Sequence, residues 1–249
     1  MTDQVLQQST ADGVLTLAMN RPDALNSLSR ALKAAMVAAL KVADADAGIR
    51  AIVITGRGRA FCAGLDLKEL GSSGAPVGTS LAADTNLGDT LAAVKKPVIA
   101  AVNGLAVTGG FELALACDMC LAGRSAWFGD THAKFGLIPG WGLSQRLPRL
   151  IGPHRAKEIS LTGRRVTAEE AERLGFINRC VDDADLGTEA QALAAAAAAF
   201  DPANVAAMKK LIDDGYAMPF GEAMEFEDRA ADANNGGVAI RPGAIGSKP

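Results

Sequence analysis

The stretch from Val98 to Asp118 contains a glycine pair and a single carboxylate that can do chemistry together. Gly109-Gly110 precedes an apolar helix that begins at Phe111, and this helix carries one charge, Glu112. Glycines let a ligand approach the backbone, and amides at a helix start can bind an oxygen atom. A buried carboxylate costs free energy unless donors or water serve it. The pattern predicts a backbone donor beside an acid–base group, although tight packing of the helix on a sheet explains the same residues.

A second glycine loop has the same relation to its neighbouring elements. Gly64-Leu65 follows a continuous apolar run, Ala51 to Thr55, which is typical of a strand buried on both faces. Both glycine loops follow a buried strand and open a helix, so both can present amides at one edge of a sheet. Two amides that converge on one carbonyl oxygen form an oxyanion hole.

The elements that position these loops alternate between strands and helices. Ser29 is the expected N-cap of a helix to about Ala45, and Asp66 can open a short one. The last third of the chain is expected to be helical. The other expected strands are Val5–Ser9, Val14–Met19, Val98–Val102, Asp118–Ala122 and Ala126–Phe128, and the other expected helices are Leu81–Val94, Leu143–Leu147, Pro153–Leu161, Ala168–Leu174, Thr188–Ala199, Ala203–Tyr216 and Phe220–Ala233.

Composition narrows the function classes. The 249 residues suffice for one large domain with a helical appendage, and a formal charge of -3 argues against nucleic acid as a partner. We find no signal-peptide pattern and no apolar run of the ~18 residues that span a bilayer, so we expect a cytoplasmic protein without a membrane partner. Cys117 and Cys120 have redox or half-metal spacing, but no second cysteine pair accompanies them, so no metal site is expected.

Taken together, the motifs of this chain resemble the crotonase superfamily, the enoyl-CoA hydratase/isomerase family. The resemblance runs from about Val5 to Ala217. It is carried by Asn20-Arg21-Pro22-x-Ala24-Leu25-Asn26, Phe61-Cys62-Ala63-Gly64-x-Asp66-Leu67, Asn103-Gly104, Gly109-Gly110-x-Glu112-Leu113-Ala114, Asp118 and Pro139-Gly140. It implies an α/β crotonase fold, in which repeated ββα units form two packed sheets (residues 1–195), followed by a C-terminal helical oligomerisation segment (residues 196–249). By resemblance the protein forms a homotrimer or a hexamer.

The resemblance also implies a substrate and a binding mode. An acyl-CoA thioester would lie with its carbonyl oxygen between the amides of Leu65 and Gly109, and coenzyme A would be part of the substrate, with no separate cofactor. Backbone groups at Ala24 and Ala63 would contact the adenine, and Asp66 would help shape that pocket. The candidate phosphate partners, each of which can equally be part of a solvated charged face, are Arg57, Arg59 and Lys68.

The acid–base pair is the main departure from the family. Hydratases of this family use two glutamates, and Glu112 matches the first, whereas His132 stands at the position of the second. A histidine can exchange protons near neutral pH, but it can also be a packed, hydrogen-bonded residue. Asp130 is interpreted as a cap of the turn that contains His132. Trp141 can line the acyl tunnel or pack in the core.

The sequence therefore predicts reversible hydration of a 2-enoyl-CoA. An enoyl-CoA isomerase, which needs one carboxylate, and a non-catalytic acyl-CoA-binding protein stay open as alternatives. The C-terminal tail is a second departure, because the chain turns to Gly236-Gly237 and Arg241-Pro242-Gly243 where the family continues a helix towards a neighbouring subunit.

Overall fold

The computed structural model describes residues 4–73 and 86–236. Contacts divide the chain into two compact units, Met1–Pro202 and Ala203–Pro249. This division lies a few residues beyond the one that the sequence suggests after residue 195. The expected tail motifs at 237 and beyond, and the start of the expected helix Leu81–Val94, lie outside the described residues.

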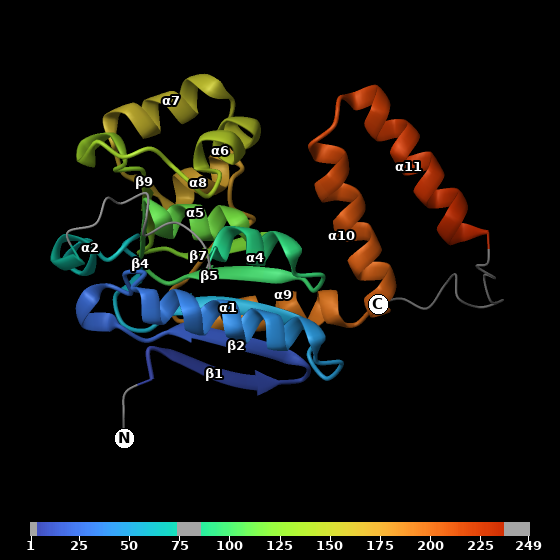
Figure 1. The fold of residues 1–249 in the computed structure, drawn as a ribbon, viewed down its shortest axis with the longest axis horizontal. Helices are drawn as coiled ribbons and strands as arrows, with labels where there is room; N and C mark the ends of the chain where they lie inside the picture. The colour runs from blue at the N-terminus through green and yellow to red at the C-terminus, as the bar shows by residue number, and fades with distance from the viewer. Residues whose placement is uncertain (1–3, 74–85, 237–249) are drawn as a thin grey trace. The chain divides into compact units, whose positions relative to one another are not determined.

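The larger sheet of the first unit has six strands in the order β1-β2-β3-β5-β7-β10 (Figure 1). β1 and β2 form an antiparallel hairpin, and every other neighbouring pair is parallel. The central strands are the continuous apolar runs that the sequence predicts, and they are buried on both faces. The six strands are β1 Leu6–Ala11, β2 Val14–Met19, β3 Ala51–Gly56, β5 Val98–Val102, β7 Met119–Gly123 and β10 Arg179–Val181.

A second, four-stranded sheet has the order β4-β6-β8-β9. β4, β6 and β8 each follow a strand of the larger sheet in the chain and pair in parallel, and β9 is antiparallel to β8. The repeated ββα arrangement is therefore confirmed. Two short strands, one around Phe61 and one directly after Asn103-Gly104, are absent from the strands that the sequence predicts. The four strands are β4 Ala60–Cys62, β6 Leu105–Val107, β8 Trp127–Gly129 and β9 Val166–Thr167.

Helices cover both sheets, and several of them begin at side-chain caps. The side chain of Ser29 accepts from Leu32 at the start of α1, and Thr167 accepts from Glu170 at the start of α8. The helices and 3-10 turns of this unit are η1 Pro22–Ala24, α1 Arg30–Ala45, α2 Leu67–Ser73, α4 Leu87–Ala93, α5 Gly109–Ala116, η2 Ala133–Phe135, α6 Leu143–Ile151, α7 Pro153–Thr162, α8 Ala168–Leu174 and α9 Leu186–Ala198.

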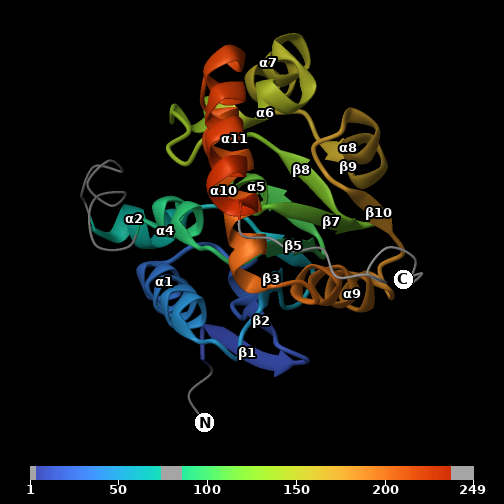
Figure 2. The same ribbon diagram turned by 90° about the vertical axis from the view of Figure 1, so that its right-hand side faces the viewer.

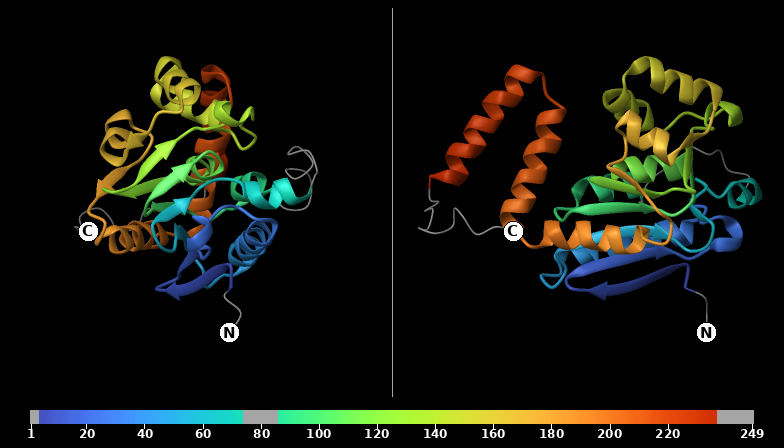
Figure 3. Two further views of the ribbon diagram at one scale, coloured as in Figure 1. Left: turned by 90° about the vertical axis from the view of Figure 1, so that its left-hand side faces the viewer. Right: turned by 180° about the vertical axis from the view of Figure 1, so that it is seen from behind.

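Two apolar clusters form the core. α9 packs on one face of the larger sheet, against β3 and β5, and Ala190 and Ala194 are fully buried there (Figures 2 and 3). The larger cluster lies between the sheets and the remaining helices. Within it, the rings of Phe111 of α5, Phe128 and Phe176 contact one another, with centroids 5.1 to 5.3 Å apart. These aromatic contacts fix the helix that carries Glu112.

The described residues of the second unit form α11 Phe220–Asn235 and all of α10 Pro202–Tyr216 except its first residue. Neither helix has a buried residue, and apolar side chains on both are exposed, among them Met208, Ile212 and Phe220. Among the helices described here, none combines the length and apolar character that crossing a bilayer requires.

Candidate active site

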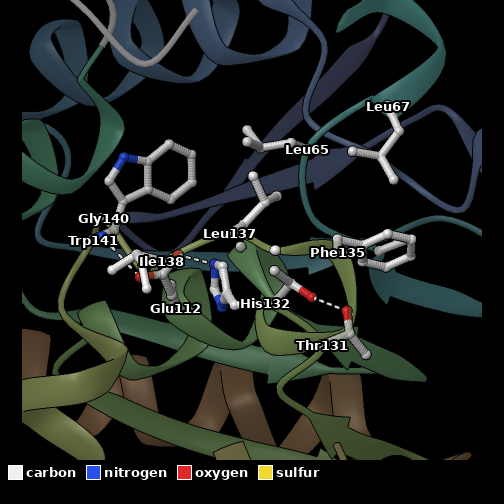
Figure 4. A pocket seen from close by; sticks show the side chains of 14 residues that line it. Leu65, Leu67, Glu112, Thr131, His132, Phe135, Leu137, Ile138, Gly140 and Trp141 are labelled. Carbon is white, nitrogen blue, oxygen red and sulfur yellow. Dashed lines mark hydrogen bonds and ion pairs between the residues drawn. The ribbon is translucent and has the colours of Figure 1, made fainter. Parts of the chain in front are cut away.

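A pocket of about 270 Å³ lies in the first unit and is lined by three chain segments (Figure 4). These segments are the loop after β4, the start of α5, and the stretch between β8 and α6. The lining residues are Ala63, Leu65, Leu67, Thr108, Gly109, Glu112, Thr131, His132, Phe135, Gly136, Leu137, Ile138, Gly140 and Trp141. Six of the eight residues that the sequence singles out as site residues are thus brought together, and the other two, Ala24 and Asp66, lie outside this lining.

The two glycine loops lie against each other. A Cβ on Gly64 would come within 3.2 Å of the amide nitrogen of Gly109, and Gly64 has a positive φ of 89°. Leu28 forms backbone hydrogen bonds with the residues before and after Leu65: its N–H donates to the carbonyl of Gly64 (2.7 Å), and its carbonyl accepts from the N–H of Asp66 (3.4 Å). The N–H of Leu65 takes no part in these hydrogen bonds. Within residues 4–73 and 86–236, neither Leu65 nor Gly109 donates its N–H to a protein acceptor.

The two glycines of the pair differ in what they do. A Cβ on Gly110 would lie 2.0 Å from the carbonyl oxygen of Cys62, so this glycine is required for α5 to pack on β4. A Cβ on Gly109 would make only ordinary contacts, and Gly109 lines the pocket. Gly110 is therefore explained by tight packing of the helix on the sheet. Gly109 is free of that constraint and can face a ligand.

Thr108, directly before this amide, has an unusual backbone conformation. Its φ of 55° and ψ of -114° are rarely adopted by a β-branched residue. Two interactions hold it, since its N–H donates to the carbonyl of Gly129 (2.9 Å) and its hydroxyl bonds to the hydroxyl of Thr131. Strained residues of this kind persist where the surroundings fix them, and they concentrate at functional sites. Neither threonine is recognisable as a site residue from the sequence.

Glu112 is almost fully buried, with 3% of its surface exposed. Its Oε1 accepts from the backbone amides of Trp141 (2.8 Å) and Leu143 (3.4 Å). Burial raises the pKa of this carboxyl above its usual value, and the Trp141 amide and His132 oppose that rise without cancelling it. The carboxyl therefore accepts two backbone hydrogen bonds, and because its pKa is raised it is a stronger base than a solvated glutamate.

The second carboxylate oxygen of Glu112 faces His132. Oε2 lies 3.6 Å from Nε2 of this buried imidazole. On the other side of the ring, Nδ1 lies 2.7 Å from Oδ1 of Asp130, which also accepts the backbone N–H of His132 (3.0 Å). Asp130 does cap its turn, as the sequence suggests, but its contact with the imidazole was missed.

Asp130 carries a negative charge in this arrangement. Burial alone would raise its pKa, but hydrogen bonds from His132 and from the Ser160 side chain outweigh burial and lower the pKa below the usual value. The sequence contained one indication of this contact. Asp130 stands two residues before His132, and an aspartate at that spacing can reach both the backbone and the ring.

The apolar part of the pocket lining includes Trp141, Leu137 and Ile138.

The residues assigned to coenzyme A by resemblance lie beside the pocket. Ala63 lines it and donates its N–H to the carbonyl of Leu25, directly after Ala24 in η1 (3.0 Å). Asp66 forms an ion pair with Arg21 (2.8 Å) and accepts from the N–H of Glu69. Burial opposes ionisation of Asp66, but the Arg21 guanidinium lowers its pKa below the usual value. The side chains of Arg57, Arg59 and Lys68 are exposed, and Arg57 donates to Gln7.

The described part of the chain contains no group of three or more His, Cys, Asp or Glu side chains placed to hold a metal ion. Cys62 and Cys120 are buried, and burial raises the pKa of each thiol to about 12. Neither thiol is an accessible nucleophile.

Comparison with known proteins identifies the family of this chain. The family model described as enoyl-CoA hydratase/isomerase matches residues 9–235. A probable peroxisomal enoyl-CoA hydratase of Arabidopsis thaliana is 40% identical over 226 residues, which are 91% of this chain and 84% of that protein. A 1,2-epoxyphenylacetyl-CoA isomerase of Escherichia coli is 43% identical over 187 residues, which are 73% of this chain and 71% of that protein.

A solved structure is also similar. The crystal structure of an enoyl-CoA hydratase from Bacillus anthracis superposes with a TM-score of 0.86 at 36% identity, and the match covers 94% of this chain and 92% of that one. Given the two-sheet fold, the paired glycine loops and these matches, the chain is a member of the enoyl-CoA hydratase/isomerase family.

Proposed function

We propose that this protein hydrates a 2-enoyl-CoA thioester, with Glu112 and His132 as its acid–base pair. The observation that supports the proposal most is that both side chains line one pocket together with Leu65 and Gly109. Addition of water to a conjugated thioester needs one group that takes a proton, one that gives a proton, and donors for the enolate oxygen. This pocket contains a candidate for each requirement.

The proposed reaction conserves the protons of the pair. The water oxygen forms a bond to the β-carbon while one proton of that water passes to one member of the pair. The electron pair of the double bond moves towards the thioester, whose oxygen accepts from the two amides. The other member of the pair then gives a proton to the α-carbon, and the carbonyl re-forms. The pair ends with the number of protons it began with, so proton exchange across the 3.6 Å gap or with solvent restores the starting state.

The remaining site assignments are part of the same proposal. Backbone groups at Ala24 and Ala63 would contact the adenine, with Asp66 holding the neighbouring loop through Arg21. Trp141 would line the acyl end of the pocket. Coenzyme A arrives with the substrate, so the proposal requires no separate cofactor. We also propose that the protein acts in the cytoplasm as a homotrimer or hexamer.

Crotonyl-CoA and a longer 2-enoyl-CoA test this function through the loss of absorbance of the conjugated thioester. We expect hydration by the wild type. Glu112→Gln should lower kcat by ~10²–10⁴-fold with little change in KM, since it removes the base but retains the size and the accepting oxygen. His132→Gln should cause a comparable loss. His154→Gln is the matched control, because His154 is the other histidine of the chain and is exposed.

Three results would contradict the proposal. Conversion of a 3-enoyl-CoA without hydration of either 2-enoyl-CoA would indicate an isomerase. Tight binding of acetoacetyl-CoA without turnover of any of these thioesters would indicate an acyl-CoA-binding protein. A large gain in hydration from His132→Glu would show that the natural pair is not adapted to this reaction.

A further inference from the structure

The imidazole of His132 has two ring nitrogens with different partners. Nδ1 lies 2.7 Å from Asp130 Oδ1, and Nε2 lies 3.6 Å from Glu112 Oε2. All three side chains are buried, with exposed fractions of 1% for Asp130, 7% for His132 and 3% for Glu112. The imidazole therefore lies between the two carboxyl groups, hydrogen-bonded to Asp130 and facing Glu112, and all three groups are shielded from bulk water.

The position of Asp130 restricts what each ring nitrogen can do. An ionised carboxylate only accepts hydrogen bonds, so Nδ1 must carry a proton to bond with it. Nε2, which faces Glu112, is then the nitrogen whose proton can be gained or lost. The same oxygen of Asp130 accepts the backbone N–H of His132, so the carboxylate is fixed relative to the ring it orients. Ser160 adds a side-chain hydrogen bond to this carboxyl.

From this geometry we infer that Asp130 is a positioning residue for acid–base chemistry: it holds His132 with Nδ1 protonated and directs Nε2 at Glu112. Asp130 lies outside the pocket lining, so it acts through His132 and does not contact substrate. The inference rests on the proposed function for its kinetic consequence. Its structural content, the protonation of Nδ1, stands independently of any substrate.

Two substitutions separate this role from a purely structural cap. Asp130→Asn keeps an oxygen for the backbone N–H and for Nδ1–H, and asparagine caps as well as aspartate does, so a cap alone would be preserved. The variant loses the negative charge that stabilises a protonated imidazole. We expect kcat to fall at least ~10-fold with KM little changed and the unfolding midpoint close to that of the wild type. Asp130→Ala removes both acceptor contacts and should lower kcat further.

The kinetic control is Asp183→Asn. Asp183 also accepts a backbone N–H, that of Ser125 (3.0 Å), but it lies outside the pocket. This variant makes the same chemical change at a capping aspartate, and we expect its kcat to equal that of the wild type.

A spectroscopic measurement tests the inference without substrate. The chain has only two histidines, so ¹⁵N-labelled imidazoles give two sets of signals, and His154→Gln assigns them. At a pH where the rings are neutral, we expect His132 of the wild type to be protonated at Nδ1. Asp130→Ala should shift His132 towards the Nε2–H form and leave His154 unchanged.

Either of two results overturns the inference. One is a neutral His132 that is protonated at Nε2 in the wild type. The other is an Asp130→Asn variant with the kcat of the wild type together with an Asp130→Ala variant whose His132 signals do not change. If the wild type hydrates no enoyl-CoA but its His132 signals behave as expected, the proposed reaction fails and the positioning role of Asp130 stands.

Discussion

Glu112 is an ionisable side chain whose burial disfavours its charged form. Burial raises its pKa, so the native state binds a proton on this group more readily than the unfolded chain does. The stabilisation from that proton is fully present below the unfolded pKa and is lost as the pH rises through the higher native pKa. At neutral pH the buried carboxylate therefore costs stability.

We expect Glu112→Gln to stabilise the folded protein at neutral pH by about 0.5–2 kcal/mol while it removes activity. Gln can accept the Trp141 and Leu143 amides through its oxygen and donate to Nε2 of His132, so no polar atom is left without a partner. Denaturant unfolding of both proteins at several pH values measures the difference in free energy. The difference should be near zero at about pH 4 and grow with increasing pH. A variant that is less stable at every pH would contradict this account.

The sequence indicates some of these residues and not others. Glu112 is recognisable because it is the single charge of an apolar helix, and His132 because it departs from a family pattern. The contact of Asp130 with the imidazole depends on how a turn folds back on itself, which residue types alone do not determine. Ala24 and Ala63 act through their backbone, so their side chains carry no signal and only the resemblance identifies them.

The turn from β6 into α5 sets the direction of the Gly109 amide, and Thr108 is its central residue. The conformation of Thr108 costs ~1–3 kcal/mol relative to an ordinary one, and its bonds to Gly129 and Thr131 offset part of that cost. Thr131 belongs to the segment that carries His132. This hydrogen bond therefore links the candidate oxyanion loop to the candidate acid–base loop.

We expect Thr131→Val, which has nearly the same shape but lacks the hydroxyl, to lower kcat several-fold by freeing the turn. Removal of a whole oxyanion donor costs about 2.7–4 kcal/mol, and a loosened donor should cost a fraction of that. Thr108→Ser retains the hydroxyl and is the matched control, with kcat near that of the wild type. Initial rates and unfolding midpoints of both variants check this. Equal rates for Thr131→Val and wild type would show that the link does not position Gly109.

The long central elements were predictable from sequence, whereas two of the short strands were not. β3 and β5 are apolar strands of six and five residues that are closed by turn residues, and α1 begins at a capping serine. β4 and β6 have three residues each, which is too short for an alternating pattern, and their pairing partners lie far along the chain. These two strands adjoin the two glycine loops. The sequence thus predicted both loops but not the sheet that brings them together.

At the scale of the whole molecule, the sequence predicted the α/β class and the helical last third, whereas the strand order came only with the structure. The resemblance supplied the two-sheet fold because many weak motifs stand in one order and spacing. How subunits assemble is not encoded in such motifs. It depends on which apolar surfaces a single chain leaves uncovered.

Self-association is the prediction that belongs to this scale. The described helices of the C-terminal unit bury none of their residues, and Met208, Ile212 and Phe220 are 59%, 63% and 82% exposed. Exposed apolar surface of this kind marks interaction sites, and identical chains most often form closed symmetric assemblies. We expect light scattering to give a trimer or hexamer of the 25.5 kDa chain.

A charge placed among these side chains should weaken that assembly. Ile212→Glu puts a carboxylate on an apolar surface that association would bury, and such burial costs several kcal/mol for an unpaired charge. Asp213→Asn, at the next and also exposed position of the same helix, is the control and should assemble as the wild type does. Sedimentation velocity over a range of concentrations measures both variants. A wild type that sediments as a monomer at every concentration would refute the prediction, and an Ile212→Glu variant that assembles as tightly as wild type would exclude this part of α10 from the interface.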